Sequence, residues 1–167
     1  MDIALRFARD VVEIVDAIVG STEVDPGSDV AIDVTLRRFG HADEIQRVRI
    51  PIPWSAAGDK IEIALEPGNL VKLDLPIAND LDQLFDNVRA GYPATSLIAS
   101  TKLATRGVKL RGHIVSELPG SALDMLQPQG EAERPTSFPA QRRLEVPLGR
   151  VVIGNAKVKL EVREEPK

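Results

Sequence analysis

The sequence predicts a mainly β protein: an antiparallel β-sandwich with one inserted α-helix and a short helical turn. Apolar and polar residues alternate with a period of two along most of the chain, which is the pattern of half-buried strands. Turn residues separate these runs at intervals of roughly 8 to 12 residues, as in sandwiches and barrels. We therefore expect a single domain over residues 1–163 and a disordered tail at 164–167.

In the first half of the chain, strands are expected at residues 3–7, 11–19, 30–36, 45–52, 60–65 and 70–75. The run at 30–36 follows a turn at Pro26 and Gly27, where proline fixes the first turn dihedral and glycine accepts a positive φ. Pro51 and Pro53 close the run at 45–52, and proline cannot donate a hydrogen bond to a sheet. This strand is therefore expected at an edge, or leaving the sheet.

A helix is expected over about residues 80–90, because its apolar residues recur at helical spacing. Asp80 is the expected N-cap, and Gly91 and Pro93 end the segment. The apolar positions are Leu81, Leu84, Phe85 and Val88.

In the second half, strands are expected at 96–103 and 108–115, then at 143–153 and 156–162 around a turn at Gly154 and Asn155. A short helix at about 121–127 and a surface loop at 128–141, which is rich in proline, are expected between them. The expected core consists of alternating apolar residues: Leu5, Phe7, Ile14, Val30, Ile32, Val34, Leu36, Ile50, Ile61, Ile63, Leu84, Leu97, Leu110, Val151, Val158 and Leu160.

The composition excludes several classes of protein. Of the 167 residues, 43% are hydrophobic and 28% are charged, which is typical of a globular chain. The net charge of −4 argues against a nucleic-acid partner, and no apolar run approaches the 18 or so residues of a membrane span. Without cysteines there is no disulfide framework. The compartment stays open: cytoplasmic if Met1 is the native start, extracytoplasmic if the chain is cut from an exported parent.

Motifs for catalysis, metals and phosphates are not found in the sequence. A nucleophile needs an adjacent base, and only His41 and His113 offer an imidazole. Ser21 and Ser121 follow glycines but lack the Gly-x-Ser-x-Gly elbow, and Ser121 is better explained as a helix cap. We therefore expect no enzyme, no catalytic residue, no metal and no cofactor. A small serine hydrolase using Ser121 or Ser21 with His113 is the alternative.

Two features are candidate binding surfaces. Lys109, Arg111 and His113 alternate along the expected strand at 108–115 and could meet a carboxylate, a phosphate or an acidic strand. The same row could equally be a solvated strand face or a charged edge that prevents aggregation. Trp54, in a proline-rich turn, is either an exposed contact residue or a cover for the open end of the sandwich.

Several segments together resemble a known family. Residues 24–34, which include the Pro-Gly turn, resemble the opening of many bacterial immunoglobulin-like domains. With residues 34–39, 47–53, 79–85, 96–103 and 117–123, the pattern is similar to the C-terminal region of bacterial proteins related to SpoIVB-type sporulation signalling peptidases. The resemblance spans about residues 10–162 and implies an immunoglobulin-like accessory module. The catalytic serine and histidine of that family belong to its peptidase-like portion, so none is assigned in this chain.

The function expected from these observations is structural or recognitional. A non-catalytic accessory module of this kind would position a neighbouring domain of the same polypeptide, or bind a protein partner through an edge strand or a loop. A carbohydrate-binding module is a further alternative. Such modules usually present several exposed aromatic rings, and this chain has one Trp and one Tyr.

Overall fold

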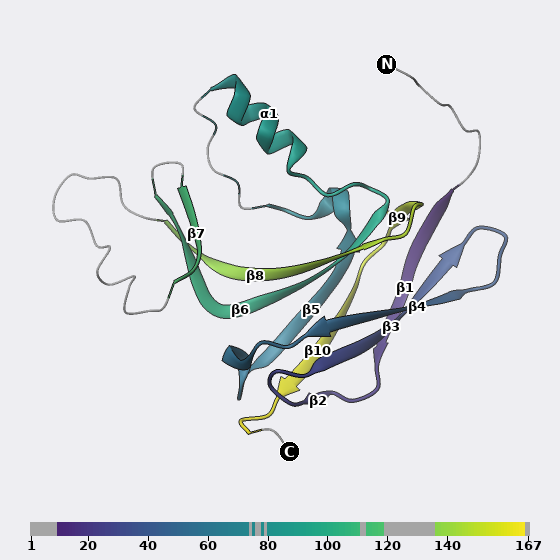
Figure 1. Ribbon diagram of the computed structural model, residues 1–167. Helices are drawn as coiled ribbons and strands as arrows, with labels where there is room; N and C mark the ends of the chain where they lie inside the picture. Colours follow the sequence, from purple (N-terminus) through teal and green to yellow (C-terminus); the bar gives the residue numbers. More distant parts are fainter. Residues whose placement is uncertain are drawn as a thin grey trace.

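Two β-sheets pack face to face in the computed structural model, which describes residues 10–73, 75, 78, 80–110, 113–118 and 136–165 (Figure 1). Over residues 104–110, 113–118 and 136–140 the description covers the backbone alone. The strands are β1 (Val11–Val19), β2 (Glu23–Val24), β3 (Asp29–Arg38), β4 (Glu44–Pro51), β5 (Lys60–Pro67), β6 (Ser96–Leu110), β7 (His113–Leu118), β8 (Thr136–Pro147), β9 (Val151–Ile153) and β10 (Ala156–Val162).

The first sheet has the order β4-β3-β1-β9, and the second has the order β2-β10-β5-β6-β7 with β8 also paired to β6. The predicted β-sandwich is confirmed. Most neighbours are antiparallel, but β1 pairs with β9 and β10 pairs with β2 in parallel. A purely antiparallel arrangement is therefore wrong for these two short pairings.

The core lies between the sheets and follows the predicted alternation. In β3, the side chains of Val30, Ile32, Val34 and Leu36 are at most 5% exposed, and they meet Ile61, Ile63 and Leu160 of the other sheet in one apolar cluster. Ile14, Ile50, Leu97 and Val158 are buried in the same cluster, as predicted. The predicted core residues Leu5 and Phe7, and the side chain of Leu110, lie outside the described residues.

Two predicted core residues are exposed instead. Val151 is 41% exposed, whereas its neighbour Val152 is buried, because β9 pairs with β1 in the register that sets Val152 opposite the buried Val12. Leu84 is 48% exposed, since the helix that carries it does not pack its apolar face on the sandwich.

The edge prediction for the proline-flanked run is confirmed, because β4 forms one edge of the first sheet. The predicted turn at Gly154 is also present, with φ at +78°. It does not close a hairpin, however: β9 lies in the first sheet and β10 in the second, so the turn carries the chain across the sandwich. A Cβ on Gly154 would lie 2.8 Å from the carbonyl oxygen of Ile14, which is why only glycine fits.

Two predicted segments differ in the structure. Residues 71–73 follow the 3₁₀ turn η2 (Gly68–Leu70) and form no strand. The loop predicted at 128–141 is wrong from Thr136 onward, where β8 begins. Proline is tolerated in β8 because, within the described part of the chain, β6 is the only strand that pairs with it. The strand predicted at 3–7 and the short helix predicted at 121–127 lie outside the described residues.

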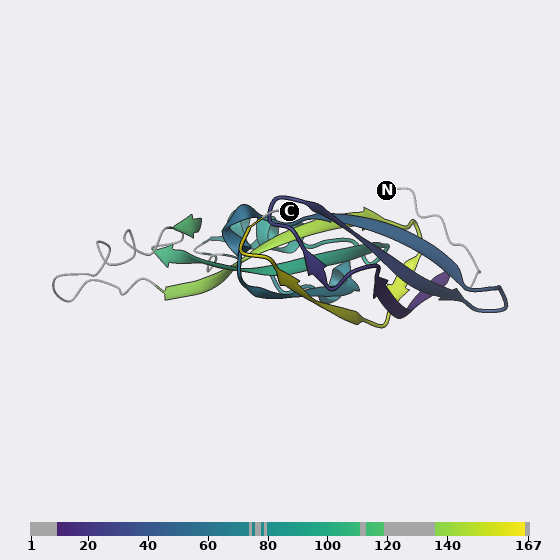
Figure 2. The same cartoon turned by 90° about the horizontal axis from the view of Figure 1, so that it is seen from below.

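The strands predicted at 96–103 and 108–115 are also divided differently. β6 runs from Ser96 to Leu110 as one strand with irregular pairing, and the chain reverses before β7. The distal parts of β6, β7 and β8 project beyond the sandwich as a three-stranded extension (Figures 1 and 2).

The predicted helix is confirmed as α1 (Leu81–Arg89), inserted between β5 and β6. The side chain of Asp80 caps it by accepting a hydrogen bond of 2.7 Å from the backbone N–H of Gln83. Figure 1 shows α1 above β8, outside the two-sheet body.

Candidate functional site

Trp54 lies at one end of the sandwich, at the start of the 3₁₀ turn η1 (Trp54–Ala56). Its indole ring rests on Gly27, because a Cβ added at Gly27 would lie only 2.3 Å from the ring carbon Cε2. Gly27 has a φ of +76°, so it supplies both the positive dihedral and the space for the ring. Trp54 nevertheless remains 67% exposed. It is therefore a fixed, largely solvent-facing aromatic side chain.

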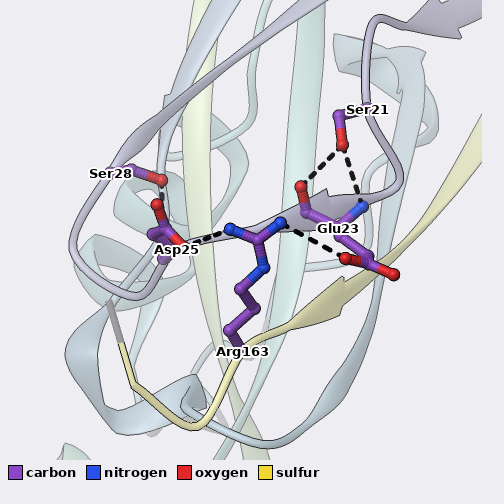
Figure 3. A network of polar contacts seen from close by, with 5 residues as sticks. All are labelled: Ser21, Glu23, Asp25, Ser28 and Arg163. Carbon is purple, nitrogen blue, oxygen red and sulfur yellow. Dashed lines mark hydrogen bonds and ion pairs between the residues drawn. The ribbon is translucent and has the colours of Figure 1, made fainter. Parts of the chain in front are cut away.

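A polar cluster holds the turn between β2 and β3 (Figure 3). The guanidinium of Arg163, just beyond β10, donates to Asp25 Oδ1 at 3.0 Å and to Glu23 Oε2 at 3.2 Å. These hydrogen bonds to Glu23 and Asp25 raise the pKa of Arg163 above its usual value. Ser28 Oγ donates to the carbonyl oxygen of Asp25 at 2.6 Å. The polar groups satisfy one another, so the cluster fixes the end of the sandwich.

The predicted row of Lys109, Arg111 and His113 does not follow one strand. Lys109 belongs to β6 and His113 to β7, and the register pairs Lys109 with Ile114 and Leu110 with His113. The expectation of a single strand over 108–115 is therefore wrong. Arg111 and the side chains of Lys109 and His113 lie outside the described part of the chain, and their role in binding stays a prediction.

The apolar side of α1 is a candidate surface, and of its apolar residues the sequence predicts only Leu84 in the core. Leu81, Leu84, Phe85 and Val88 are 70%, 48%, 57% and 73% exposed, and no residue of the helix is buried. Their spacing of three and four residues places them on one side of the helix. We call these four residues the α1 apolar face. The helical spacing of these residues in the sequence predicts the face, but it does not predict what the face packs against.

A shallow groove of about 440 Å³ lies over β5 and β10. Its charges are paired across the strands: Lys60 with Glu161 at 3.7 Å, and Glu62 with the neighbouring Lys157 at 2.8 Å. The hydrogen bond from Lys157 lowers the pKa of Glu62. Because most of its charged side chains already form ion pairs, this groove is a weaker candidate for a binding site than the α1 apolar face.

The residues of the hydrolase alternative are only partly described. Ser21 Oγ donates to the carbonyl oxygen of Glu23 at 2.7 Å and accepts from its N–H at 3.2 Å, which closes a local turn. Ser121 lies outside the described residues. Within the described ranges, no group of three or more histidines and carboxylates is placed to hold a metal ion. The helices described there are also too short or too polar to cross a bilayer.

Comparison of the chain with protein-family models, with curated proteins and with solved structures finds no match. The resemblance to SpoIVB-related proteins and the immunoglobulin-like identity therefore stay predictions.

Proposed function

We propose that this chain is a non-catalytic protein-interaction module that presents α1 to an apolar groove on a partner protein or on a neighbouring domain. The observation that carries the proposal is the α1 apolar face. An amphipathic helix in a globular domain normally buries its apolar stripe in the core, and this helix buries none of its residues. A contiguous apolar patch of this kind is a common mark of an interaction site.

The length of α1 supports the same proposal. Isolated helices shorter than roughly 12–15 residues are marginal in water, and most helical stability in proteins comes from tertiary packing. α1 has nine residues and an Asp80 cap worth about 1 kcal/mol, and its four apolar side chains remain 48% to 73% exposed. A partner that covers the α1 apolar face would supply the missing packing.

Charge and area indicate the kind of partner. Asp80, Asp82 and Asp86 outnumber Arg89 on this segment, so a groove with a basic rim is complementary to it and an anionic lipid surface is not. A standard protein–protein interface buries about 800 Å² on each partner. Two nine-residue helices that cross each other would bury less surface than this. A groove that wraps the helix is therefore favoured over self-association through α1 alone.

The resemblance indicates a setting for this module. Residues 79–85, which include the start of α1, are among the segments similar to SpoIVB-related proteins. In that setting the module would be an accessory domain of a peptidase-related protein, and the groove would belong either to the neighbouring domain or to a separate protein. An accessory role requires no catalytic residue in this chain.

Affinity capture from the source organism, quantified by mass spectrometry, tests the proposal. The bait is compared with a variant carrying Leu84→Ser and Val88→Ser. The matched control carries Ile18→Ser and Ile153→Ser, which change exposed apolar residues of the first sheet, away from α1. Urea unfolding first establishes that all three share the same stability. We expect a specific protein to be lost at least fivefold from the apolar variant and retained by the control. If every captured protein responds equally to both variants, the proposal is wrong.

A further inference from the structure

Among the residues that the structure describes, β4 pairs with β3 alone, which leaves this edge of the first sheet open. The N–H of Ile52, just beyond β4, donates to the carbonyl of Ser28 at 2.8 Å, and its own carbonyl accepts from Gly27. Ile52 therefore directs both backbone groups toward the β3 side. Backbone groups alternate between the two sides of an antiparallel strand. The N–H and C=O groups of Ile45, Arg47 and Arg49 consequently point away from β3, toward the open edge.

Pro51 fits this alternation. It is next in the series that faces the open edge, and it has no N–H to donate. A strand added to β4 would therefore find three consecutive donor and acceptor sets, at Ile45, Arg47 and Arg49, and then a stop. The edge can accept a short extended segment in one limited stretch.

The side chains along this edge are basic. Arg47 donates two hydrogen bonds to Asp33 of β3, at 2.7 and 2.9 Å, so β3 partly neutralises it. Arg49 lies opposite Ala31 in the β3–β4 register and is exposed. Among the described residues, no carboxylate lies within ion-pair distance of Arg49. Opposite charges on adjacent strands attract, and an added strand would lie next to Arg49 on the side away from Ala31.

We propose that the β4 edge binds an extended acidic segment of another protein as an added antiparallel strand. Acidic residues at alternate positions would lie opposite Arg47 and Arg49, and the intervening residues would lie beside Val48 and Ile50 at the rim of the core. A second copy of this chain fits less well, because antiparallel pairing centred on Val48 would place arginine opposite arginine. This surface lies on β4 and does not depend on α1.

Binding of designed peptides by fluorescence anisotropy tests the proposal. The probes are fluorescein-labelled Thr-Glu-Val-Glu-Val-Glu-Thr and its counterpart with lysine in place of glutamate. Two further acidic peptides carry N-methyl groups, one on its glutamates and the other on its valines. In the proposed register the glutamate N–H groups face β4. Methylation of the glutamate nitrogens should therefore remove hydrogen bonds between the peptide and β4, whereas methylation of the valine nitrogens should not.

We expect the acidic peptide to bind at least tenfold more tightly than the lysine peptide. N-methylation of glutamate should weaken binding more than tenfold, and N-methylation of valine by less than threefold. Arg49→Glu should weaken it at least fivefold, and the matched charge change Lys159→Glu, on the exposed face of β10, by less than twofold. On binding, hydrogen exchange should slow at the amides of Ile45, Arg47 and Arg49.

Three results would overturn the proposal. The first is equal binding of the acidic and lysine peptides, or no binding of either. The second is equal sensitivity to both methylation patterns, which would show charge attraction without strand addition. The third is protection of amides on another strand. Urea unfolding of the Arg49→Glu variant shows whether weaker peptide binding comes from the changed charge or from an unfolded protein.

Discussion

Gly27→Ala tests whether the turn under Trp54 is built as the structure shows. A left-handed dihedral such as the +76° of Gly27 costs a residue with a Cβ about 1–2 kcal/mol. The added methyl would also displace the indole, because it would lie 2.3 Å from Cε2. About a third of the Trp54 surface is buried, since the residue is 67% exposed. A third of the roughly 200 Å² of a tryptophan side chain is worth about 1.5 kcal/mol. The expected loss of stability is therefore about 3 kcal/mol.

Gly40→Ala is the matched control for the backbone contribution. Gly40 has nearly the same dihedral, with φ at +75°, and a Cβ there would meet no atom within 4 Å. This variant should lose only the backbone cost of about 1–2 kcal/mol. The difference between the two glycine variants measures the displacement of the indole ring.

Trp54→Ala completes a double-mutant cycle. Once the ring is absent, Gly27→Ala should cost only as much as Gly40→Ala, which gives a coupling of about 1.5 kcal/mol between the two sites. Urea unfolding followed by circular dichroism serves for all variants, because Trp54 is the only tryptophan and its removal abolishes the fluorescence signal. Additive losses within 0.5 kcal/mol or so would refute the contact between Trp54 and Gly27.

Three further predictions concern stability. Thr101→Val should raise the free energy of unfolding by about 1 kcal/mol, because the Thr101 hydroxyl is buried without a partner in the described structure; an unchanged urea midpoint would contradict this. Ile63→Ala should lower the free energy of unfolding by about 2–5 kcal/mol, because Ile63 is fully buried. Leu84→Ala should lower it by less than about 0.5 kcal/mol, because Leu84 is 48% exposed. Similar losses of the two variants in urea unfolding would show that Leu84 is a core residue. The hydrogen bond from Arg47 lowers the pKa of Asp33 below its ordinary 3.8, so this group stabilises the fold above about pH 4 and loses its effect as the pH falls through the lowered pKa. The melting temperature of Asp33→Asn should therefore fall less steeply below pH 4 than that of the parent, and parallel curves would count against the pair.

The strands and the helix were predictable because their signals are local. The alternation at 30–36 sets which residues of β3 are buried, and the same rule places Ile61 and Ile63 of β5 in the core. Asp80 is a helix cap wherever the helix happens to pack. Pro51 and Pro53 restrict β4 to an edge because they lack N–H groups, whichever strand lies beside it.

The remaining features depend on what lies beside each segment. Pro139 suggests a loop, but it is tolerated because β8 pairs with one strand, β6, among the described residues. Alternation predicts that one of Val151 and Val152 is buried, and the pairing of β9 with β1 selects Val152. The run at 108–115 keeps its alternation through the reversal between β6 and β7, and Gly112 is its only turn signal. The face of α1 could not be assigned either, since its period is the same for a buried helix and for a docking helix.

The α1 apolar face and the β4 edge should bind different partners, because the two surfaces differ in chemistry. α1 offers apolar surface on an acidic segment inserted between strands of the second sheet, whereas β4 offers backbone groups beside two arginines at the edge of the first sheet. Burial of apolar surface contributes affinity but depends little on the orientation of the partner. Backbone hydrogen bonds and charge pairs along an added strand instead fix its register and select its sequence. The two surfaces share no residue, so Leu84→Ser with Val88→Ser should leave binding of the acidic peptide unchanged. Arg49→Glu should likewise leave capture through α1 unchanged. Such independence would allow one module to hold two partners, or two parts of one partner, at the same time.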